Sequence, residues 1–133
     1  MTDTDPRQLL SDSDAIVQSA ISTLVHAKRS IAIFSHDLPK AIYDDSSVLD
    51  ALVKLANASR LASVRVIVSR PRMATTHAPK FLDLFRRLQS TMELRALNEE
   101  AGHHEETFIV SDETHVIYQP SETRWEATYA PDA

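Results

Sequence analysis

The alternation of helical segments with short apolar runs constrains the fold of this chain more than any other feature. Ile31-Ala32-Ile33-Phe34 is a continuous apolar run, as expected for a buried strand, and Val64–Ser69 is the next strand. Apolar residues recur at helical spacing before, between and after these strands. Further strands are expected at Met92–Leu97, Thr107–Ser111, Val116–Gln119 and Trp125–Tyr129.

The resulting order is α-β-α-β-α-β followed by more strands. Strands that are separated by helices are expected to pair in parallel through right-handed crossovers. The last strands are expected to add a hairpin that turns at Asp112-Glu113-Thr114. This order predicts an α/β fold with a mixed β-sheet flanked by helices. We expect residues 1–10 to form a flexible acidic tail and residues 11–133 to form one domain.

Composition excludes several classes of site. The chain has one glycine, where average usage predicts roughly nine, so Walker-type and dinucleotide-binding loops are excluded. The lack of cysteine excludes disulfides and thiolate zinc sites and fits a reducing cytoplasm. The acidic N-terminus is unlike a secretory leader, and no apolar run reaches the length of a membrane span. We therefore expect a cytoplasmic protein with no membrane association and no cofactor.

The charge of the chain is distributed unevenly. The net charge of −5 argues against nucleic acid as a partner. However, residues 51–82 hold no carboxylate and carry +6, which leaves −11 for the rest of the chain. A basic surface on an acidic protein is suited to an anion or an acidic partner. The alternative is that these basic residues are scattered, solvated side chains.

Three segments resemble one half of the phospholipase D-like fold. "AKRSIAIFSHDL" resembles its opening helix end and first strand, and "LVKLANASRLASVRVIVS" resembles its second helix and the strand after it. "TFIVSDETHVIYQP" resembles its motif strand, aspartate turn and returning strand. "SHDL", "RVIVSR" and "HAPKFLDLFRRLQS" are similar to a group of small bacterial domains related to that superfamily. The resemblance implies a half-domain that dimerises to build one active site.

The catalytic motif of that superfamily reads His, any residue, Lys, four residues, Asp. This chain departs from that motif. Aligning it on Asp112 places Thr107 at the lysine and Glu105 at the histidine, and a shift by one residue offers His104 but puts Glu106 at the lysine. Glutamates would repel a phosphate. His104 and Asp112 are therefore only weak catalytic candidates, and whether the chain is an enzyme stays open, with the missing lysine arguing against it.

Two loops that leave the expected strands hold candidate ligand-binding residues. Parallel sheets bind ligands outside the carboxyl ends of their strands. Ser35 and His36 follow the first strand, and Arg70, Arg72 and His77 follow the second, where arginine forks would suit an anion. The alternatives are a turn segment at Ser35-His36-Asp37, which does not form a triad by adjacency, and an exposed loop at the arginines.

Two other clusters have plainer interpretations. His103, His104, Glu105 and Glu106 match no standard zinc spacing, so a solvated loop is favoured and no metal is expected. Trp125 and Tyr129 could form an interface, although core packing on a final strand is the alternative.

The resemblance and these sites together predict a non-catalytic phospholipase D-like domain. It would be a homodimer that binds a small anionic ligand or a protein partner. The alternatives are a divergent phosphodiesterase or hydrolase of the same class acting as a homodimer, and a structural or regulatory protein–protein interaction domain.

Overall fold

The computed structural model describes residues 8–97, 106–121 and 127–130. These residues form one seven-stranded sheet with the strand order β1-β7-β6-β5-β2-β3-β4. The strands are β1 (Gln8–Leu10), β2 (Ser30–Ser35), β3 (Ser63–Val68), β4 (Met92–Ala96), β5 (Thr107–Ser111), β6 (His115–Gln119) and β7 (Ala127–Ala130). The helices are α1 (Ser13–Val25), α2 (Lys40–Tyr43), α3 (Ser46–Ala58), α4 (Pro71–His77) and α5 (Pro79–Arg87).

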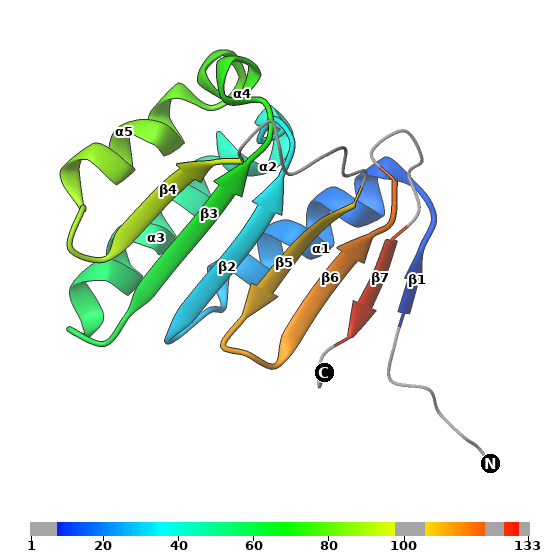
Figure 1. Cartoon of the computed structure of the whole chain (residues 1–133). Helices are drawn as coiled ribbons and strands as arrows, with labels where there is room; N and C mark the ends of the chain where they lie inside the picture. Colours follow the sequence, from blue (N-terminus) through cyan, green and yellow to red (C-terminus); the bar gives the residue numbers. More distant parts are fainter. Residues whose placement is uncertain (1–7, 98–105, 122–126, 131–133) are drawn as a thin grey trace.

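The predicted fold class is confirmed, because the sheet is mixed and is flanked by helices (Figure 1). β2, β3 and β4 pair in parallel, as expected for strands with helical connections. β5 and β6 form an antiparallel hairpin, and β5 pairs antiparallel with β2. β2 therefore joins the parallel part of the sheet to its antiparallel part.

The core lies between the helices and one face of the sheet. Alternate side chains of β3 show this, since Val64, Val66 and Val68 are buried while Arg65 and Ile67 are exposed. α1 packs on α3, and α3 packs on α5, so the main helices form one layer. Figure 1 shows this layer behind the sheet, with the opposite face of the sheet uncovered by any described helix. None of the helices in the described segments combines the length and apolar character that crossing a bilayer requires.

Three local predictions differ from the structure. The segment after the second strand was expected to be a loop, but Pro71–His77 form α4. Proline suits the first helical position, because the N–H group that it lacks would have no partner within the helix there. Lys40–Tyr43 form the unexpected helix α2, which is too short to show an apolar period. Gln8–Leu10, within the expected tail, form β1 by pairing with β7. The prediction that residues 11–133 form one domain is not tested by these elements.

Asp112 connects the β5–β6 turn to the start of β2. Its carboxylate accepts the backbone N–H groups of Lys28, Arg29 and Ser30 at 3.0, 2.6 and 3.0 Å. Its own N–H donates to the Ser30 carbonyl oxygen at 2.7 Å. Asp112 and Glu113 both have positive φ (54° and 63°), as in the tight turns that match the twist of a hairpin. Asp112 therefore stabilises the fold and sets the register between β5 and β2.

The ionised form of Asp112 is favoured in the folded protein. Burial is the largest single effect and raises the pKa of Asp112. The three backbone N–H donors and the charge of Arg29 together outweigh it, so the pKa lies below its usual value. A carboxylate whose pKa falls on folding stabilises the protein above its unfolded pKa of about 3.9 and loses that contribution as the pH falls through its folded pKa.

Replacing Asp112 with asparagine should lower the free energy of unfolding at neutral pH by about 1–3 kcal/mol, because hydrogen bonds to a charged acceptor are lost. Urea denaturation measures this difference, which should shrink below about pH 4, where the unfolded wild-type carboxyl is protonated. The exposed Asp50 on α3 gives the control, and D50N should change the stability by less than about 0.5 kcal/mol. Equal stability of D112N and the wild type at neutral pH would contradict this role.

Candidate functional site

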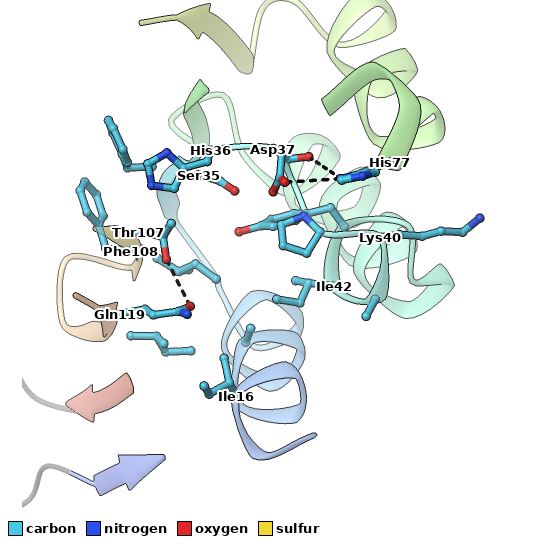
Figure 2. Close-up of a pocket in the computed structure, with 17 residues that line it drawn as sticks. Ile16, Ser35, His36, Asp37, Lys40, Ile42, His77, Thr107, Phe108 and Gln119 are labelled. Carbon is cyan, nitrogen blue, oxygen red and sulfur yellow. Dashed lines mark hydrogen bonds and ion pairs between the residues drawn. The ribbon is translucent and has the colours of Figure 1, made fainter. Parts of the chain in front are cut away.

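A cavity of about 450 Å³ lies at the carboxyl end of β2, between the sheet, α1 and α2 (Figure 2). Most of its lining is apolar. The apolar side chains come from α1, from α2 and from the helix-facing side of β5 and β6, and include Ile16, Ala20, Ile42, Tyr43, Ile109 and Ile117. The volume falls in the range of small-molecule sites, roughly 300–1,000 Å³. The cavity can therefore hold a small organic molecule.

His36 is the most deeply buried histidine of the described residues and lies in the lining. It is 3% exposed, and its Nδ1 lies 2.7 Å from the Oγ of Ser69. Two backbone bonds, from Ser69 N–H to the Ser35 oxygen and from Arg70 N–H to the His36 oxygen, hold the ends of β2 and β3 together. The Nε2 of His36 is buried and has no hydrogen-bond partner among the described residues. A buried polar atom left unpaired costs about 1–3 kcal/mol, so a ligand atom bonded there would be stabilised.

The backbone after His36 adopts an uncommon conformation. Leu38 is fully buried and has a φ of 53°, which costs a residue with a side chain about 1–3 kcal/mol. The Oγ of Ser35 accepts the N–H of Leu38 at 3.1 Å and helps to hold this bend. The bend turns the chain from β2 into α2 and places α2 over the cavity. Strain of this kind gathers at functional sites.

His77 and Asp37 join α4 to the loop after β2 at the edge of the cavity. The Nδ1 of His77 lies 3.2 Å from the backbone oxygen of Asp37 and 3.8 Å from its Oδ2. Both side chains are about one-third exposed (31% and 28%), so the pair lies at the mouth. The exposed Lys40 lies nearby in the lining (Figure 2).

The side chains of Thr107 and Gln119 in the cavity already have local partners. The hydroxyl of Thr107 donates to the Gln119 side-chain oxygen at 3.4 Å (Figure 2). The Gln119 amide donates to the Ser121 oxygen at 3.0 Å. Complete burial raises the pKa of Tyr43 well above its usual range, so its phenol stays neutral. The interior of the cavity is therefore neutral and apolar, and its charged groups lie at the mouth.

The predicted ligand-binding residues fall into two groups. Ser35, His36 and His77 line the cavity. Arg70 and Arg72 do not line it, because they lie at the start of α4 and are exposed. Ser35, His36 and Asp37 bond three different partners, so these adjacent residues form no triad. Sequence reasoning missed Ser69 as a partner of His36, although its place at the end of a parallel strand was a usable signal.

The other predicted residues lie elsewhere. Asp112 lies at the opposite end of β5 from the cavity and bonds backbone, as described above. Tyr129 is half-buried on β7. His104 and Trp125 lie outside the described residues. Across residues 8–97, 106–121 and 127–130, no group of three metal-ligating side chains could hold an ion.

The fold is shared with a solved structure. TrmBL2, an archaeal chromatin protein with a novel mode of DNA binding, superposes with a TM-score of 0.69 and 14% sequence identity. The match covers 100% of this chain and 46% of TrmBL2, so this chain spans less than half the length of that protein. At this identity the likeness shows the fold. No curated protein matches the chain.

These comparisons correct the predictions that followed from the resemblance. Membership of the phospholipase D-like superfamily is wrong, since neither the matching family nor TrmBL2 supports it. The non-catalytic phospholipase D-like function falls with it, as do the alternatives and the expected homodimer and anionic ligand. The prediction against nucleic acid as a partner is contradicted as well, since TrmBL2, with which the chain shares its fold, is a DNA-binding protein. The resemblance failed because helix–strand alternation is common to many α/β folds and because Asp112, on which the motif was aligned, serves the hairpin.

The family of the chain follows from its sequence match, which begins at Asp12, the N-cap of α1, and includes every described residue that lines the cavity. Residues 12–133 match the family described as Domain of unknown function (DUF7931), and the chain belongs to that family.

Proposed function

We propose that this domain binds a small, uncharged and largely apolar molecule in the cavity at the carboxyl end of β2. The cavity itself carries the proposal, because its volume of about 450 Å³ and its apolar lining suit such a molecule. Burial of apolar surface would supply most of the affinity, at roughly 25 cal/mol per Å² before the cost of association. The earlier preference for an anion loses its basis, since Arg70 and Arg72 lie outside the lining.

The polar end of the cavity sets an orientation for the ligand. Thr107 and Gln119 bond one another, so these two side chains do not need a hydrogen bond from the ligand. The Nε2 of His36 lacks a partner among the described residues. Because this nitrogen has almost no accessible surface, the ring would have to turn toward the cavity to meet a ligand. A ligand with one hydroxyl or carbonyl group at that end would then bind more tightly than its hydrocarbon analogue. The lack of cysteine also keeps the cytoplasm as the proposed location.

Two small, uncharged aromatic compounds test the cavity. We expect 1-naphthol and indole to raise the melting temperature of the wild-type protein, because a ligand that binds only the native state stabilises it by about 2.7 kcal/mol at one hundred times its Kd. Ala41 lies exposed on α2 in the cavity lining, so A41W should block the mouth and weaken binding at least tenfold without disturbing the core. Isothermal titration measures the affinities.

The controls separate blocking from a general effect of tryptophan. A58W, on the exposed end of α3, should bind like the wild type. H36F keeps a ring of similar size and should reduce the preference for 1-naphthol over naphthalene. If neither ligand binds the wild type, or if A58W loses binding as A41W does, the proposal is overturned.

A second candidate function is weak contact with single-stranded nucleic acid on the uncovered face of the sheet. The observation that favours it is a row of aromatic rings: Phe34, Phe108 and Tyr118 are register partners across β2, β5 and β6, and Phe34 and Phe108 also border the cavity. The rings of Phe34 and Phe108 stack at 5.8 Å, and Tyr118 is 39% exposed. Arg65 and Arg95 are exposed beyond this row, on β3 and β4, where Arg95 pairs with Glu93 at 3.0 Å. Aromatic rings with neighbouring arginines suit unpaired bases, and TrmBL2 is itself a DNA-binding protein.

Electrostatics predicts how strongly salt should affect this second candidate function. The net charge of −5 repels a polyanion, so stacking has to provide most of the affinity. Two arginines on single-stranded DNA would give a slope of log K against log salt of about −1.4. Fluorescence anisotropy with a short oligothymidylate, from about 50 to about 200 mM salt, should show weak binding with this shallow slope and still weaker binding of duplex.

The double variant R65E/R95E should abolish this binding. R86E changes an exposed arginine on the last turn of α5, on the helix layer, and should leave binding nearly unchanged. An equal loss in both variants would show that only net charge matters and would reject the sheet face as the site.

A further inference from the structure

A second hollow, of about 630 Å³, lies on the other side of α1 from the cavity described above. Ile16 and Ala20 of α1 face the first cavity, whereas Ala15, Ser19, Ser22 and His26 recur at helical spacing along a different stripe and face this one. A helix normally packs on a sheet through large apolar side chains. Here the stripe is small and polar, so α1 does not fill the space above β6 and β7.

The floor of this groove, which we call the polar groove, comes from three strands. Ser111 ends β5, His115 begins β6 and Tyr129 lies on β7, and all three line the groove. Ser111 is 2% exposed, and His115 and Tyr129 are half-buried. The rings of His115 and Tyr129 lie 6.5 Å apart with an interplanar angle of 30°, so they form a nearly continuous platform.

Local bonds occupy one ring nitrogen of each histidine in the polar groove. The Nδ1 of His26 lies 2.8 Å from the Ser22 carbonyl oxygen, which can only accept, so Nδ1 carries the proton. The Nε2 of neutral His26 is then an acceptor. The Nδ1 of His115 is likewise paired, with the Thr114 hydroxyl at 3.1 Å, and its Nε2 retains the remaining capacity of the ring. Gln18, Ser22 and the phenol of Tyr129 add donors and acceptors of both kinds.

The charge of the polar groove restricts its ligand. None of the described residues that line it is an aspartate, glutamate, lysine or arginine, so no described lining residue carries a fixed charge that would neutralise an ion. Hydroxyl groups both donate and accept and match a mixed set of imidazole, amide and hydroxyl partners. The two neighbouring rings, tilted by 30°, offer an aromatic surface for the face of a ring. We propose that the polar groove binds a neutral, ring-shaped polyhydroxy compound of the sugar or cyclitol class, with the ring over His115 and Tyr129 and a hydroxyl donating to His26.

This proposal does not depend on the proposed function, because none of the described residues lines both hollows. Titration of the ¹⁵N-labelled full chain with glucose, cellobiose and myo-inositol tests it by NMR. The expected result is saturable shifts of the amides of Ser22, His26, Ser111 and His115 with at least one compound. Glycerol serves as the control for general solvent effects, since it has hydroxyls but no ring.

Two variants locate the binding. H26L replaces an exposed side chain at the C-terminal cap of α1 and should weaken the affinity about tenfold, while Y129S removes half of the platform and should weaken it at least as much. A41W blocks the other cavity and should leave this affinity unchanged. Circular dichroism confirms that each variant is folded. No saturable shift with any of the three compounds, shifts that glycerol reproduces, or affinities that H26L and Y129S both leave intact would overturn the proposal.

Discussion

The carboxylate of Asp112 is the contact on which the arrangement of this fold depends. It gathers three successive backbone N–H groups at the start of β2 from a position 82 residues later in the chain. These donors have no partner within a helix or strand at that point, because α1 has ended and β2 has only begun. One side chain therefore bonds the backbone N–H groups of the segment that leads into β2, and it fixes where the β5–β6 hairpin meets β2. Everything on the antiparallel side of the sheet is placed by this register.

The position of β2 explains why the hollows form where they do. On one side of β2 lie the parallel strands β3 and β4, which α3 and α5 cover. On the other side lie β5, β6, β7 and β1, which have only α1. A single helix cannot cover four strands that are each about 4.8 Å apart. Space therefore remains on both sides of α1. The apolar stripe of α1 borders an apolar cavity, and its polar stripe borders a polar groove.

The sequence predicted those parts of the fold whose signals are periodic. Ile31–Phe34, Val64–Ser69 and the turn at Asp112 were placed correctly, since apolar runs and turn residues are local signals. α2 and β1 were missed because each has four residues or fewer and is formed by tertiary contacts. The candidate site was partly predictable: Ser35, His36 and His77 line the cavity. The His36–Ser69 contact joins residues 33 apart and depends on the register between β2 and β3, which the sequence does not state.

Conflicts with local structural rules occur at both ends of β2: the turn that meets its start holds Asp112 and Glu113 at positive φ, and its carboxyl end lies beside the cavity. At its start, the donors of Lys28, Arg29 and Ser30 are all bonded. At its end, Leu38 holds a positive φ while fully buried, and His36 buries a ring nitrogen without a partner among the described residues. Both features destabilise the fold, and an apolar side chain at position 36 would remove the second one. Natural proteins depart from local consistency mainly at functional sites. The same strand thus provides both the most completely bonded connection of the fold and its best candidate for a binding site.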